Sequence, residues 1–120
     1  MTDIKKILLA EDELLIAKVL RMQLERNGYE VKNVTTANEA VELVRSWNPD
    51  LIILDVFLKN SSSGIDAGKN IRKAGINTPV IYTTGNSYHS TLNDIEEISN
   101  VRLLTKPVEF EYLMHVMQEL

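Results

Sequence analysis

The sequence predicts an α/β protein built on a doubly wound, parallel sheet of five strands with helices on both faces. Short apolar runs alternate along the chain with segments in which apolar residues recur at helical spacing. The run 51–54 is continuously apolar, which is typical of a strand buried on both faces, as in a parallel sheet. Glycine, proline and asparagine residues punctuate the pattern between segments.

Composition places the chain among ordinary soluble domains. Its 120 residues suffice for a single domain over residues 1–120, and 44% of them are apolar and 25% charged. The formal net charge of -4 argues against nucleic acid as a direct partner, and the absence of cysteine excludes disulfides and thiolate sites. The sequence has neither a signal-peptide pattern nor an apolar run long enough for a membrane span, so we expect a cytoplasmic protein.

The strands are predicted at short runs rich in branched apolar residues. In order, these runs are residues 4–10, 29–34, 51–54, 79–84 and 101–104. The helices are predicted where apolar residues recur three or four positions apart. They cover residues 14–24, from 36 or 38 to 44, 65–74, 90–98 and 110–120.

Breakers and caps set the ends of these helices. Asn27-Gly28 ends the first helix and Gly75 ends the third. Either Thr36 or Asn38 can cap the second helix, with Trp47 just past its body. The entry to the fourth helix, residues 87–93, is crowded with poor helix formers, so this helix is predicted to be either short or mobile.

Polar side chains follow four of the predicted strands. Glu11 and Asp12 follow the first strand, Asp55 the third, Thr84 the fourth and Lys106 the fifth. Because the carboxyl ends of parallel strands meet at one edge of a sheet, we expect these side chains to gather there. Three carboxylates so close together repel unless a cation lies between them, and oxygen donors suit Mg²⁺, with Mn²⁺ as a substitute.

The same residues are what phosphoryl transfer to a carboxylate requires. Asp55 can supply the nucleophilic oxygen, while the metal and Lys106 neutralise charge on the phosphoryl oxygens. Thr84 can then donate a hydrogen bond to the product. Each residue alone also has a structural interpretation, since strand-end acids often cap helices and single lysines are often solvated. The combination of these residues at the ends of neighbouring strands favours a reactive site over the structural interpretations.

The chain resembles the receiver domain of two-component response regulators from Ile7 to the last helix. The resemblance rests on four segments in order, which are Leu8-Leu9-Ala10-Glu11-Asp12-Glu13, Pro49-Asp50-Leu51-Ile52-Ile53-Leu54-Asp55, Pro79-Val80-Ile81-Tyr82-Thr83-Thr84-Gly85 and Leu104-Thr105-Lys106-Pro107. It implies a CheY-like, flavodoxin-like (β/α)5 fold with strand order 2-1-3-4-5.

The resemblance also assigns roles to the acidic residues. It implies that Asp55 is the phosphoacceptor and takes the group from a sensor histidine kinase or a phosphotransfer protein. Glu11 and Asp12 match the acidic pair that binds Mg²⁺, with Asp12 a direct ligand and Glu11 acting partly through water. Phe57 stands where the family uses a backbone carbonyl as a further ligand to the metal.

The remaining implied roles concern the signal. Thr84 matches the switch hydroxyl and Lys106 the family's lysine, with Pro107 following it through a bond that is often cis. Movement of Thr84 toward the phosphate would shift the face of the last strand and the last two helices. That face would bind a downstream partner, an output domain or a second copy of the domain. Leu103 stands where the family often has an aromatic switch residue, so the signal could leave by another route.

Three alternatives remain open. A haloacid-dehalogenase-type phosphatase would need a second Asp where Phe57 stands, and a flavodoxin-like nucleotide or flavin binder would need a Gly-rich loop after the first strand. A pseudo-receiver that only docks partners would not need the complete acceptor set. We therefore expect a phosphoacceptor that assists its own phosphotransfer and dephosphorylation, and not an enzyme acting on a separate substrate.

Overall fold

The computed structural model describes residues 3–58, 63–85 and 88–120, and for residues 88–90 the main chain alone. The strands are β1 Lys6–Ala10, β2 Glu30–Val34, β3 Leu51–Asp55, β4 Val80–Thr84 and β5 Val101–Thr105. The helices are α1 Leu14–Arg26, α2 Ala37–Trp47, α3 Gly64–Lys73, α4 Tyr88–Ile95 and α5 Phe110–Gln118. Residues 59–62, between β3 and α3, and residues 86–87, between β4 and α4, lie outside the described residues.

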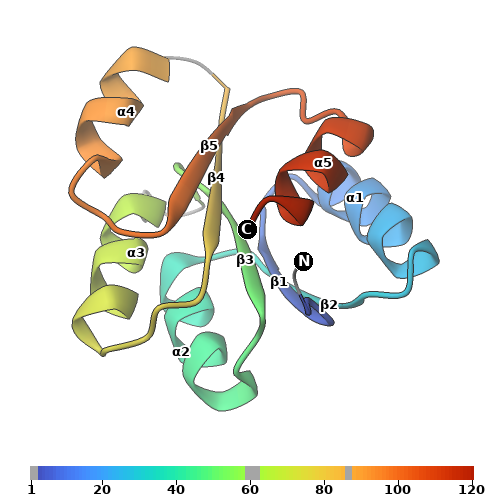
Figure 1. Ribbon diagram of the computed structural model, residues 1–120, viewed down its shortest axis with the longest axis horizontal. Coiled ribbons are helices and arrows are strands. Elements are labelled where there is room, and N and C mark those ends of the chain that lie inside the picture. The colour runs from blue at the N-terminus through green and yellow to red at the C-terminus, as the bar shows by residue number, and fades with distance from the viewer. Residues whose placement is uncertain (1–2, 59–62, 86–87) are drawn as a thin grey trace.

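All neighbouring strands pair in parallel, in the order β2-β1-β3-β4-β5, as predicted. β3 lies at the centre and is buried along its whole length, because helices cover both of its faces. α1 and α5 lie on one side of the sheet and α2, α3 and α4 on the other (Figure 1). The chain is therefore doubly wound, and the carboxyl ends of all five strands point to the same edge.

Alternate residues of the central strands face two separate cores. Ile7, Leu9 and Ile53 pack with α1 and α5, while Leu8 and Ile52 pack with α2, α3 and α4. This alternation explains why β1 and β3 read as unbroken apolar runs in the sequence. Within the described residues, no helix combines the length and apolar character that crossing a bilayer requires.

Helix ends differ from the prediction by one or two residues in α1, α3 and α5, and by more in α2 and α4. α2 is capped by Thr36, not Asn38, through a capping box with Glu39, and the helix extends through Trp47 to a left-handed Asn48. The prediction that Trp47 lies past the helix is therefore wrong, because the indole packs against the core from the last turn.

α4 is the second of these larger differences, since it spans residues 88–95 and not 90–98. Beyond Ile95 the chain makes a tight turn in which the Ile98 N–H donates to the Ile95 carbonyl at 2.9 Å. Both isoleucines are buried in the same core, so the apolar spacing continues past the end of the helix. Periodicity alone cannot distinguish this turn from another turn of helix.

Candidate functional site

Three carboxylates lie together at the carboxyl edge of the sheet. Glu11 and Asp12 follow β1, and Asp55 ends the neighbouring strand β3. One oxygen from each of the three side chains lies within 4.8 Å of the others. Glu11 and Asp55 are buried, whereas Asp12 is half-buried. Such a group of hard oxygen donors fits Mg²⁺ or Mn²⁺, and the partial exposure of Asp12 leaves the group in reach of solvent.

Lys106 reaches this cluster from the turn after β5. Its Nζ lies 2.6 Å from Asp55 Oδ2 and 3.1 Å from Glu11 Oε2, so one ammonium bridges two buried acids. Burial alone lowers the pKa of the Lys106 ammonium, but the hydrogen bonds to Asp55 and Glu11 outweigh it and raise the pKa above its ordinary value. The Lys106–Pro107 peptide bond is cis, as the resemblance implies. Lys106 therefore stays charged beside Asp55 at neutral pH.

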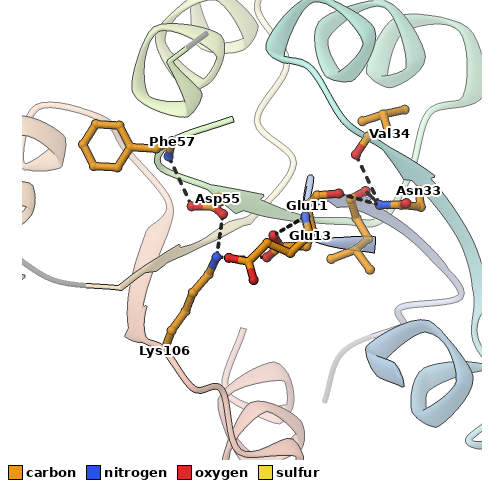
Figure 2. Close-up of polar contacts among 8 residues, drawn as sticks. Glu11, Glu13, Asn33, Val34, Asp55, Phe57 and Lys106 are labelled. Carbon is orange, nitrogen blue, oxygen red and sulfur yellow. Dashed lines mark hydrogen bonds and ion pairs between the residues drawn. The ribbon is translucent and has the colours of Figure 1, made fainter. Parts of the chain in front are cut away.

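The second oxygen of Asp55 is also held. The Phe57 N–H donates to Asp55 Oδ1 at 3.2 Å, while Lys106 binds Oδ2 on the other side (Figure 2). The Phe57 ring points away from the carboxylate and is 68% exposed, so only the main chain of this residue serves the site. Both Asp55 oxygens are thus oriented by neighbours, and each keeps a lone pair for a further contact.

Glu11 combines a structural and a charged contact. Its Oε1 accepts the Glu13 N–H at 3.0 Å, just before α1 begins, and its Oε2 pairs with Lys106. Glu11 thus fixes the main chain just before α1, although its side chain does not cap that helix, whose N-cap residue is Glu13. The Asp12 carboxylate has no hydrogen bond or ion pair within the described part of the chain, which leaves its oxygens available for a metal or water.

Asn33 is a supporting residue that the sequence did not single out. From β2, its amide donates to the carbonyls of Leu9 at 2.8 Å and Val34 at 3.2 Å, next to the turn that presents Glu11 (Figure 2). It thereby fixes the main chain where β1 ends. Asparagine is a poor strand former, so its place within β2 was the available signal, but only the pairing of β1 with β2 shows what it binds.

Thr84 ends β4 at the same edge of the sheet and is fully buried. Its carbonyl accepts the Lys106 N–H at 2.8 Å, so the main chains of Thr84 and Lys106 are directly joined. Thr83 is opposite Asp55 in the β3–β4 register, which puts Thr84 one residue further toward the rim. Glu11, Asp12, Asp55, Thr84 and Lys106 therefore lie at or just beyond the strand ends, and Lys106 pairs with both Glu11 and Asp55.

A hollow with a mainly apolar lining adjoins the charged cluster. It has a volume of about 340 Å³ and lies between α1 and the turn that carries Lys106. Leu15, Ile16 and Val19 of α1 line it, and these side chains are also exposed. An apolar helix face beside a buried charged cluster is suited to contact with another protein.

A family model described as the response regulator receiver domain matches residues 7–118. The chain is 38% identical over 80 residues to the alkaline phosphatase synthesis transcriptional regulatory protein PhoP of Bacillus subtilis, covering 67% of this chain and 33% of that protein. It is 30% identical over 110 residues to the transcriptional regulatory protein DltR of Streptococcus agalactiae, covering 91% and 48%. The chain thus spans half or less of the length of these relatives.

A solved structure gives the same result for the fold. The receiver domain of the Francisella response regulator 1452 superposes with a TM-score of 0.85 at 29% sequence identity, covering 96% of this chain and 94% of that one.

Proposed function

The chain belongs to the response regulator receiver domain family, and from that membership we propose that it is a phosphorylation switch whose acceptor is Asp55. The proposed donor is the phosphohistidine of a sensor histidine kinase or of a phosphotransfer protein. The observation that carries the proposal is the placement of Asp55, which is buried among two acids and one lysine with both of its oxygens held. An aspartate that merely ended a strand would need none of these neighbours.

The transfer step forms one bond and breaks one. A carboxylate oxygen of Asp55 attacks the phosphorus, the new P–O bond forms, and the P–N bond to the donor imidazole breaks. The imidazole keeps the electron pair of that bond and takes up a proton. Lys106, already 2.6 Å from Asp55, stabilises the negative charge that gathers on the phosphoryl oxygens. Thr84 donates its hydroxyl to the bound phosphoryl group.

We propose that Asp12, Asp55 and the Phe57 carbonyl hold Mg²⁺, or Mn²⁺ in its place, with Glu11 acting partly through water. The support is the donor set, since the Lys106 ammonium pairs with only two of the three acids and the Asp12 carboxylate has no partner among the described residues. What a bound divalent cation supplies here is neutralisation of charge on the phosphoryl oxygens. The residues themselves supply the orientation of the acceptor.

The exposed apolar face of α1 is the proposed contact for the donor protein. Leu15 is 75% exposed and Val19 49%, and both line the hollow next to Lys106 and Glu11. A donor helix seated there would carry its phosphohistidine to Asp55. Burial of these side chains would supply the apolar part of the binding free energy.

The signal is proposed to leave through α4, β5 and α5. Because the Lys106 N–H binds the Thr84 carbonyl, a displacement of Thr84 is transmitted to the end of β5. Half-buried Leu103 and exposed Tyr112 lie on this face and line a shared groove. A downstream protein, an output domain or a second copy would bind there. The chain thus acts as a switch that assists its own phosphotransfer and dephosphorylation, and it has no separate substrate.

The proposal is tested with acetyl phosphate as a small donor. In Mg²⁺, the wild-type protein should gain the mass of one phosphoryl group, and Asp55→Asn should gain none while keeping its fold. Asp94→Asn, which removes an exposed acid from α4, is the matched control and should be modified like the wild type. An unmodified wild type would instead support the docking-only pseudo-receiver, and a modified Asp55→Asn would refute the acceptor assignment.

A further inference from the structure

The hydroxyl of Tyr82 joins β4 to the start of α3. Tyr82 is fully buried, and its Oη donates to the Gly64 carbonyl at 2.9 Å. Burial raises the pKa of the Tyr82 phenol far above its ordinary value, so the hydroxyl keeps its proton and remains a donor. This contact is a side-chain hydrogen bond from the strand that ends in Thr84 to the segment that follows the acceptor.

Gly64 in turn packs directly against the main chain of Asp55 and Val56. Its N–H donates to the Val56 carbonyl at 2.9 Å, and a methyl group at Gly64 would overlap the Asp55 carbonyl oxygen. The preceding residue, Ser63, pairs with Phe57 in an isolated antiparallel bridge. The first turn of α3 therefore sets the position of residues 55–57, which include the acceptor and the proposed metal-binding carbonyl.

A second glycine makes room for this hydroxyl. A methyl group at Gly68 would overlap Tyr82 Oη, and the next nearest atom is Tyr82 Cζ at 3.1 Å. A glycine inside a helix destabilises it relative to alanine. At position 68, however, glycine is needed for the phenol to reach Gly64. Tyr82, Gly64 and Gly68 thus fit one another closely at the back of the site.

We propose that the Tyr82 hydroxyl is a positioning group for the phosphoacceptor loop. Through Gly64 it holds the main chain of Asp55 to Phe57 where the acceptor oxygens and the Phe57 carbonyl serve the site together. Tyr82 itself contacts neither the metal nor the phosphoryl group. The inference rests on the proposed function, since it assigns Tyr82 a part in Mg²⁺ binding and phosphorylation.

The test compares Tyr82→Phe with the wild type in Mg²⁺ affinity, by calorimetry, and in the rate of modification by acetyl phosphate. Loss of one hydrogen bond that orients the loop should weaken Mg²⁺ binding roughly three- to tenfold and slow modification to a similar extent. Tyr29→Phe removes the hydroxyl of a half-buried tyrosine just before β2, at the amino end of the strands, and is the matched control, which should leave both values unchanged. Equal effects of the two variants, or no effect of Tyr82→Phe, would overturn the positioning role of Tyr82 but leave the proposed function standing.

A second measurement tests the contact independently of metal. Gly68→Ala should lower the urea midpoint of unfolding in the wild type, because the methyl group meets the hydroxyl, and should lower it less in the Tyr82→Phe background. Equal shifts in the two backgrounds would overturn the inferred fit. Failure of the wild type to bind Mg²⁺ or to accept a phosphoryl group would overturn the proposed function, and the positioning role with it.

Discussion

Replacing Asp12 by asparagine should make the metal-free protein more stable. One carboxylate oxygen of Asp12 lies within 4.8 Å of a carboxylate oxygen of Glu11 and of Asp55. Lys106 forms ion pairs with Glu11 and Asp55 but not with Asp12. Two unit charges at that separation repel by about 0.9 kcal/mol in water and about 3.5 kcal/mol at an effective dielectric constant of ~20. Because Asp12 is half-buried, we expect a gain near the lower value, about 1 kcal/mol.

The assay is urea unfolding at pH 7, once with a chelator and once with Mg²⁺. In chelator, Asp12→Asn should unfold at higher urea than the wild type. In Mg²⁺, the wild type should gain stability as RT ln(1 + [Mg²⁺]/Kd), about 1.4 kcal/mol at tenfold excess over the Kd, and the variant should gain little. When Mg²⁺ is added, the stability advantage of Asp12→Asn over the wild type should therefore shrink or change sign.

The control is Glu42→Gln, which removes an exposed acid from α2 outside the cluster and should leave both midpoints within about 0.5 kcal/mol. A metal-free Asp12→Asn less stable than the wild type would refute the repulsion argument. An undiminished response of that variant to Mg²⁺ would refute Asp12 as a ligand.

Two further predictions concern stability. From α3, the Arg72 guanidinium donates to four main-chain carbonyls in the turns before β4 and β5. Arg72→Met should therefore lower the free energy of unfolding by about 2–4 kcal/mol. Arg72→Lys should restore little of this stability, because lysine lacks the planar guanidinium that reaches several carbonyls at once. Lys69→Met, an exposed neighbour, is the control; an equal loss there would contradict the assignment. The pairing of Lys106 should stabilise the fold at every pH below about 10.4, the value for an unfolded lysine, and lose this effect as the pH rises through the raised folded pKa. The stability difference between wild type and Lys106→Met should thus stay constant from neutral pH to about pH 9; a decline within that range would contradict the direction of the shift.

The sheet was predictable because its signal is local. Buried parallel strands must be apolar on both faces, so the runs ending at Ala10 and Asp55 identify β1 and β3 without any contact information. The charged site followed from the same reasoning, since the carboxyl ends of parallel strands share one edge. Residues distant in sequence could therefore be grouped in space before any distance was known.

What could not be predicted depends on packing between elements. The predicted end of α4 was wrong because the Ile98 side chain continues the apolar spacing, although the main chain leaves the helix after Ile95. The contacts of Asn33 and Tyr82 depend on which strand or helix lies opposite, and a single sequence does not state that. Gly68 looks unfavourable in a helix until the phenol that it accommodates is known.

The central claim is that the phosphoryl group forms an acyl phosphate on Asp55 and on no other acid of the cluster. Reduction of the modified protein with borohydride converts an aspartyl phosphate to homoserine, which peptide mass spectrometry locates by residue. We predict homoserine at position 55 alone. Homoserine at position 12, a reduced glutamate at position 11, or modification without any reducible acyl phosphate would contradict the account.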